Sequence, residues 1–237
     1  MLQQADRLER LLSPRAHQPS RRAMLRGGAL LVGAASVTTM FGAAPAAAQD
    51  VASDEDLLSV LNYALSLEHL ENAFYRDGLA SLTIEAFTTL GFQPSVVDYV
   101  AQIGTDEAAH VATLTQVITD LGGSPVEEGA YNFEAALGDA AAFLATAMAL
   151  ENTGVGAYTG AAQYLIDNDE LLTAALTIHG VEARHAAYLN ILNEENPFPE
   201  AFDPPLTPAE VVEIATPFIT AAEVVTPNAA AEATPVP

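Results

Sequence analysis

Two segments of the chain repeat one pattern of polar residues within apolar, helix-forming sequence. Each copy has Leu-Glu with a tyrosine seven residues after the glutamate, followed later by Ile-x3-Glu-x2-His; the copies begin at Leu67 and Leu150. Glu-x2-His places a carboxylate and an imidazole on the same face of a helix, since residues three apart are neighbours there. The repeat therefore predicts four helices, each carrying an acid on a face that is otherwise apolar.

Apolar periodicity predicts helices over residues 54–77, 94–122, 139–166 and 168–193. Ser53 and Asn168 can cap the first and last of them, and Gly122-Gly123 ends the second. The segment 81–90 has room for one short extra helix. No segment alternates as a half-buried strand does, so the predicted fold class is all-α.

The lengths of the connections predict how the helices are arranged. Only Asp167 separates the third and fourth helices, whereas about 16 residues separate the second and third. The last two helices must therefore be antiparallel. The long middle connection predicts a four-helix bundle with one crossover between helices 2 and 3, rather than a simple up-and-down bundle.

Residues 1–48 have the form of an export signal. Arg21-Arg22 precedes an apolar stretch that ends before Ala46-Ala47-Ala48. This order is typical of a twin-arginine signal peptide with a small-residue cleavage site, so we expect an exported protein in the periplasm or another extracytoplasmic space. An uncleaved anchor is the alternative, because the apolar stretch approaches the roughly 20 residues that a membrane span needs.

The rest of the chain divides at the first of a series of prolines. Residues 54–195 would form the bundle. Residues 196–237 form an acidic tail whose prolines prevent a long helix. We expect this tail to be partly disordered. Thr207-Pro208-Ala209-Glu210 has the form of a capping box, which predicts a short helix near 208–215.

Charge and composition exclude several classes of function. The formal net charge is -23, and beyond residue 48 only Arg76 and Arg184 accompany 29 of the 31 acidic residues. Such a surface repels phosphate backbones and anionic lipid headgroups, so we expect no nucleic-acid partner and no membrane docking after signal cleavage. The absence of cysteine excludes disulfides, iron-sulfur clusters and cysteine-ligated zinc.

The repeated acids point to a metal site. Each of the four glutamates lies near the middle of its predicted helix, and mid-helix positions of an antiparallel bundle meet at one level. Unpaired, each buried carboxylate would cost several kcal/mol, whereas two divalent ions would neutralise four of them. Oxygen and imidazole ligands suit iron or manganese, and zinc is also compatible. The candidate ligands are Glu68, Glu107, His110, Glu151, Glu182 and His185.

Other polar residues near these positions need separate interpretations. Glu71, three residues after Glu68, is an alternative ligand, although only Glu68 has the tyrosine seven residues on. We expect Tyr75 and Tyr158 to be core residues whose hydroxyls form hydrogen bonds near the site, rather than redox-active groups. His69 and His179 have no counterpart in the other half of the chain. Both are expected at the surface or behind the ligands, with His179 the better candidate for a supporting role.

One glutamate on each of two helices, with Glu-x2-His on each of two others, is the ligand set of ferritin-like di-iron and di-manganese proteins. The chain resembles that superfamily over roughly residues 54–195. The segments 67–75, 106–110 and 181–188 are most similar to exported bacterial ferritin-like proteins related to plant desiccation-related proteins. Rubrerythrin-type peroxidases add a cysteine-ligated iron, which this chain cannot hold.

The resemblance implies roles for the six candidate ligands. Glu68 and His110 would hold one metal, Glu151 and His185 the other, and Glu107 and Glu182 would bridge the two. The partners would be metal ions and a small oxidant, and an oligomer is compatible with the sequence. We expect an oxidase, catalase-like enzyme or ferroxidase that uses dioxygen, peroxide or ferrous iron. The alternative is a non-catalytic stress or envelope protein in which the bundle is structural.

Overall fold

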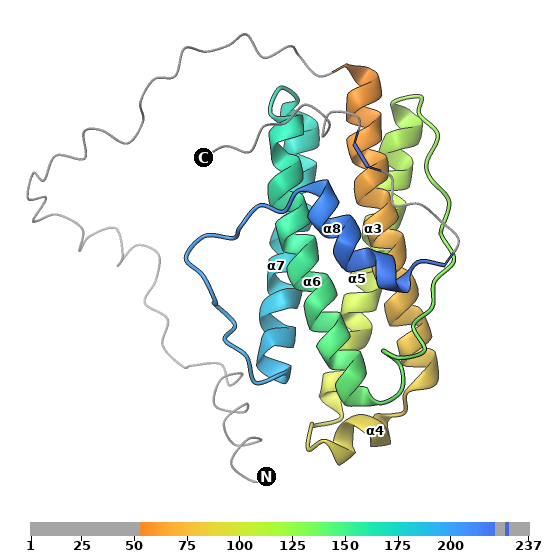
Figure 1. The fold of residues 1–237 in the computed structure, drawn as a ribbon, viewed down its shortest axis with the longest axis vertical. Helices are drawn as coiled ribbons and strands as arrows, with labels where there is room; N and C mark the ends of the chain where they lie inside the picture. Colours follow the sequence, from red (N-terminus) through yellow and green to blue (C-terminus); the bar gives the residue numbers. More distant parts are fainter. Residues whose placement is uncertain (1–52, 221–225, 228–237) are drawn as a thin grey trace, which may run out of the picture. The chain divides into compact units, whose positions relative to one another are not determined.

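A computed structural model describes residues 53–220 and 226–227 (Figure 1). Within these residues every regular element is a helix, which confirms the predicted all-α class; the sole β contact there is an isolated bridge between Tyr131 and Ile219. The predicted export signal, residues 1–48, lies outside the described residues. The elements are α3 (Asp54–Ser81), α4 (Ile84–Thr89), α5 (Ser95–Asp120), α6 (Ala140–Ala161), η1 (Ala162–Leu165), α7 (Asp169–Leu192), α8 (Pro208–Ala215) and η2 (Thr216–Phe218).

Side-chain caps begin four of the helices. The predicted caps Ser53 and Asn168 accept hydrogen bonds from backbone N–H groups at the start of α3 and α7. Asp139 does the same for α6, and Thr207 begins α8 with the expected capping box to Glu210. Each cap satisfies a backbone donor that the helix itself leaves unpaired.

The predicted end of the first helix at Asp77-Gly78 is wrong, because α3 continues to Ser81. A Cβ atom on Gly78 would lie 2.3 Å from Cε2 of Phe143 on α6. Glycine is therefore required here for close packing of two helices, not for helix termination. The third helix also differs from its prediction, since regular α-helix stops at Ala161 and the 3-10 helix η1 follows.

Helix α3 packs beside α5, and α6 packs beside α7. The connection between the two pairs runs back along α3 (Figure 1), where Asn62 donates a hydrogen bond to the Ser124 carbonyl. Further along α3, Arg76 donates two hydrogen bonds of 3.0 Å to the carboxylate of Glu128. This is the predicted crossover, and it makes α5 and α6 run in the same direction.

Two large apolar clusters fill most of the bundle, one around Phe74 and Phe143 and the other around Leu65 and Ile118. On each long helix, the residues of the first cluster lie on one side of the central glutamate and those of the second cluster lie on the other side. The four glutamates therefore lie in a polar layer between two apolar ones. A third, smaller cluster contains Tyr63, Ala157 and Val211.

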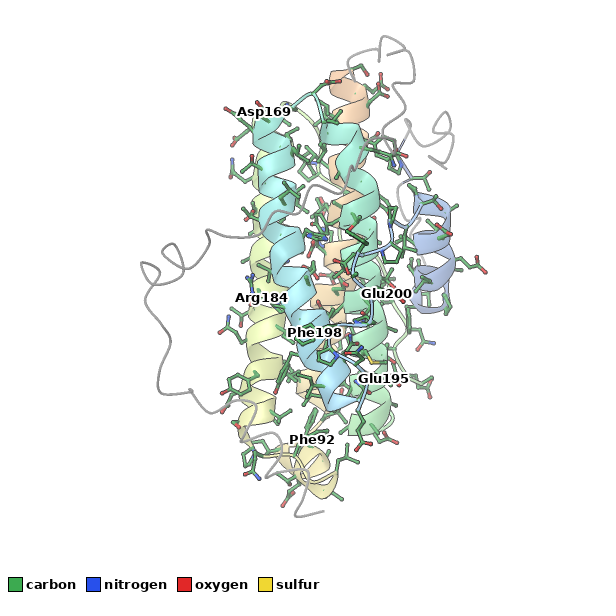
Figure 2. All side chains as sticks on the ribbon, turned by 90° about the vertical axis from the view of Figure 1, so that its left-hand side faces the viewer. Phe92, Asp169, Arg184, Glu195, Phe198 and Glu200 are labelled. Carbon is green, nitrogen blue, oxygen red and sulfur yellow. The ribbon has the colours of Figure 1, made fainter. Side chains whose placement is uncertain are left out.

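The segment after α7 returns across the bundle. Leu206 donates a backbone hydrogen bond to the carbonyl of Gly156 on α6, and Phe198 and Glu200 mark the preceding part of the segment in Figure 2. Helix α8, the short helix predicted near 208–215, then packs against α6. Among the described residues, no helix has the length and apolarity that crossing a membrane requires.

Candidate metal centre

The structure brings all six candidate residues together in the polar layer. The four glutamates have relative exposures of 0 or 1%, and His110 and His185 have exposures of 8% and 7%. They form two groups in which one nitrogen or oxygen atom from each residue lies within 4.8 Å of the others. The first group is Glu68, Glu107, His110 and Glu182; the second is Glu107, Glu151, Glu182 and His185.

Glu107 and Glu182 belong to both groups. They lie on α5 and α7, the helices that carry the Glu-x2-His motif, and the spacing of three residues turns both side chains of each motif inward. Arg184 lies within the second motif, yet it is exposed on the surface of α7 (Figure 2). The helical period thus keeps the one basic residue near this motif out of the acidic layer.

Both imidazoles face the carboxylates through Nδ1. His110 Nδ1 lies 3.1 Å from Glu68 Oε2, 3.0 Å from Glu107 Oε2 and 3.2 Å from Glu182 Oε1. His185 Nδ1 lies 3.0 Å from Glu107 Oε1 and 3.2 Å from the nearer oxygen of Glu151. In each ring, Nδ1 is therefore placed to bind the same cation as the carboxylates that surround it.

The cluster perturbs the pKa of its members strongly. Burial favours neutral imidazoles, but hydrogen bonds to the surrounding carboxylates outweigh it and raise the pKa of His110 to about 12 and that of His185 to about 11. Burial raises the pKa of Glu107 to about 7, although both histidines oppose this rise. Burial and repulsion from Glu151 hold the pKa of Glu182 well above its usual range. Without a cation, protons must balance the charge of this site.

Three buried carboxylate oxygens at the centre, Glu107 Oε1 and both oxygens of Glu182, accept no hydrogen bond of acceptable geometry. His185 Nδ1 and His110 Nδ1 approach Glu107 Oε1 and Glu182 Oε1, but these short contacts are not aligned as hydrogen bonds. Glu107 and Glu182 are the two residues shared by both groups, and leaving such atoms unsatisfied is costly. A pair of cations would satisfy them while the imidazoles act as neutral ligands. The residues present therefore fit a dinuclear metal site with nitrogen and oxygen ligands.

Two tyrosine hydroxyls hold the outer carboxylates. Tyr75 on α3 donates a 2.6 Å hydrogen bond to Glu151 on α6, and Tyr158 on α6 donates to Glu68 on α3. The expected hydrogen bonds near the site are present, but each tyrosine serves the glutamate of the other half of the chain. Burial and the nearby carboxylates raise the pKa of both hydroxyls well above their usual range, which keeps them protonated donors.

Sequence reasoning missed Asp106. Its Oδ2 atom lies 3.2 Å from Nε2 of His185, on the side of the ring away from the carboxylate cluster. A carboxylate in this position holds a proton on Nε2 and leaves Nδ1 for a metal. Asp106 directly precedes Glu107, but its partner lies on another helix, so spacing along the chain contains no signal for the contact.

The remaining candidates lie outside both groups. Glu68, not the alternative Glu71, is grouped with His110. His69 Nε2 lies 3.2 Å from the carbonyl of Val126 in the crossover. His179 Nε2 lies 3.0 Å from the hydroxyl of Thr159 on α6.

Comparison with known proteins agrees with this geometry. A family model described as a ferritin-like domain matches residues 56–195, a range that contains all six residues of the two groups. Among curated proteins, none matches the chain.

Proposed function

This chain belongs to the ferritin-like domain family, and we propose that it is an exported dinuclear oxidoreductase that binds two iron or manganese ions. Its substrates would be small: dioxygen, peroxide or ferrous iron. The observation that carries the proposal is that Glu107 and Glu182 belong to both ligand groups. Shared carboxylates hold two ions close together, and a close pair of ions is the arrangement that two-metal chemistry uses.

Each group supplies a terminal carboxylate and an imidazole in addition to the shared acids. Glu68 and His110 would hold one ion, and Glu151 and His185 the other. Four carboxylates neutralise two divalent ions, so the loaded site carries no net charge into the apolar bundle. When bound, such a pair supplies reversible electron exchange with a small oxidant.

The surrounding residues position this site and limit its access to water. The apolar clusters on either side of the polar layer leave the four glutamates essentially unexposed. The hydroxyls of Tyr75 and Tyr158 fix the orientation of the two outer carboxylates. Asp106 orients the His185 ring from outside. Because the ligands lie on four packed helices, we expect their positions to be fixed and not to adapt to each ion.

The test of function combines metal content with turnover. Protein purified from its exported form should contain about two iron or manganese ions per chain, and it should consume dioxygen, consume peroxide or oxidise ferrous iron. Glu107→Gln should abolish both properties, whereas Glu127→Gln on the exposed crossover should change neither. Bound metal without any of the three activities would favour the non-catalytic alternative, and protein that never binds metal would refute the proposal.

The proposal that the protein is exported rests on the twin arginines alone, so it needs its own test. Replacing Arg21 and Arg22 together by lysine should retain the protein in the cytoplasm, because lysine keeps the charge but loses the planar guanidinium. The matched control replaces Arg7 and Arg10 by lysine and should leave export intact. Fractionation with antibody detection measures both variants; unchanged export of the first would refute the twin-arginine route.

A further inference from the structure

The segment that crosses the bundle after α7 covers a cavity. We call residues 197–206 of this segment the strap. Near its start, the N–H of Phe198 donates a hydrogen bond to the side-chain oxygen of Asn196, and at its end Leu206 is hydrogen-bonded to the Gly156 carbonyl. A cavity of about 310 Å³ lies between the strap and helices α6 and α7. Cavities of about 300 Å³ or more are large enough for a small molecule.

A buried amide on the helix side of this cavity has an unused donor. Asn190 on α7 lines the cavity and has a relative exposure of 5%. Its Oδ1 accepts a 2.9 Å hydrogen bond from Nδ2 of Asn152 on α6, which turns the Asn190 Nδ2 away from Asn152. Among the described residues, no hydrogen bond uses Nδ2 of Asn190. Because buried amides normally have partners, a molecule in the cavity with an acceptor oxygen would supply the missing one.

The strap contributes two acids to the wall of the cavity. Glu200 and Asp203 line it and are exposed, so solvent reaches their carboxylates. Arg76 and Arg184 are the only arginine or lysine side chains in the described part of the chain, and neither forms an ion pair with these two acids. Strap prolines and α7 alanines make much of the remaining wall aliphatic. The cavity therefore repels anions and attracts cations that have an alkyl part.

These features together specify one class of ligand. The amide of Asn190 requires an acceptor oxygen, and the two carboxylates form their strongest hydrogen bonds with a charged donor. We propose that the cavity binds a small aliphatic amine that carries an amide or hydroxyl oxygen. Its ammonium group lies beside Glu200 and Asp203, and its oxygen accepts a hydrogen bond from Asn190. None of the six candidate metal ligands lines the cavity, so this site is independent of the dinuclear function.

Three related compounds test the assignment. N-acetylputrescine has both the ammonium group and the amide oxygen, N-butylacetamide lacks the charge, and n-butylamine lacks the oxygen. Each is titrated into the ¹⁵N-labelled protein at about 0.15 M salt, where distant charges are screened, and the side-chain amide signal of Asn190 is followed by NMR. N-acetylputrescine should shift this signal with a Kd of about 1 mM or lower. The other two compounds should bind at least about threefold more weakly, because each lacks one hydrogen-bonding group.

Matched variants locate the binding site. Asn190→Leu removes the amide donor, and Glu200→Gln combined with Asp203→Asn removes two exposed charges without altering the core. Each change should weaken N-acetylputrescine binding about three- to tenfold. Glu127→Gln combined with Glu134→Gln removes the same charge from the crossover and should leave the affinity unchanged. Thermal unfolding and metal content of each variant check that the fold and the metal centre are intact.

Equal affinities for N-acetylputrescine and n-butylamine would show a general attraction of cations to an acidic surface and would overturn the proposal. Equal affinity for the neutral N-butylacetamide would overturn the role of the carboxylates, and with it the assigned class of ligand. The absence of saturable binding, or wild-type affinity in the Glu200→Gln and Asp203→Asn double variant, would also overturn it. None of these results would affect the dinuclear function proposed above.

Discussion

Replacing Glu182 by glutamine should change protein stability in opposite directions with and without metal. Glu182 has no exposed surface, both of its oxygens lack hydrogen-bond partners, and neighbouring carboxylates repel it. Glutamine has the same size, carries no charge and can donate hydrogen bonds to those carboxylates. In the metal-free protein the substitution should therefore stabilise the fold by about 1 to 3 kcal/mol, the usual cost of an unsatisfied buried group.

The metal-bound protein should show the reverse. An ion present at 100 times its dissociation constant stabilises the folded state by about 2.7 kcal/mol. For a chain of this size that corresponds to a rise in Tm of roughly 5 to 11 °C. Glu182 belongs to both ligand groups, so Glu182→Gln should lose most of this gain. Glu68 belongs to only one ligand group, so Glu68→Gln should retain more of the stabilisation that metal provides.

The assay is thermal unfolding followed by circular dichroism, with chelator and with saturating metal. With chelator, Glu182→Gln should have a higher Tm than the wild type. With metal, the wild type should have a higher Tm than the variant. Glu127→Gln, exposed on the crossover, serves as the charge-matched control and should follow the wild type throughout. A variant less stable than the wild type in chelator, or a wild type indifferent to metal, would refute this reasoning.

Three further perturbations test other parts of the structure. Tyr158→Phe removes the donor to Glu68 and should weaken metal binding about tenfold, measured by chelator competition; an unchanged affinity would contradict the supporting role of that hydrogen bond. Gly160→Ala should destabilise the protein by about 1 to 3 kcal/mol in denaturant unfolding, because its Cβ would lie 2.0 Å from the carbonyl oxygen of Leu206; wild-type stability would show that the segment can move away. The metal-free protein should lose stability between pH 5 and 8, because the pKa of Glu107 is raised from 4.5 to about 7 on folding and the folded state therefore binds more protons over that interval. Melting across this range measures the effect, and stability that rises with pH would contradict it.

Much of the fold could be predicted because its signals are local. Apolar periodicity located the four long helices, and capping residues such as Ser53 and Asn168 marked where two of them begin. The long connection before Asp139 predicted the crossover. Helical spacing also indicated which polar residues share a face, so the six residues of the candidate centre could be chosen before their distances were known.

Contacts between helices were not predictable in the same way. Gly78 resembles a helix terminator in the sequence, but the close approach of Phe143 explains why glycine is needed there. The pairing of Tyr75 with Glu151, rather than with the glutamate on its own helix, appears only once α3 and α6 are packed together. The contact between Asp106 and His185 likewise joins two separate helices.

The sequence by itself determined the helices, their order and the residues that each turns inward, because these follow from hydrogen bonds and side-chain spacing within one helix. Only the tertiary structure decided which inward-facing residues touch, and it placed Glu71 opposite Gly154 beside Glu182. Such contacts depend on the rotation, register and separation of neighbouring helices. Those quantities are set by how the side chains of the whole core pack together, which no single segment of the chain encodes.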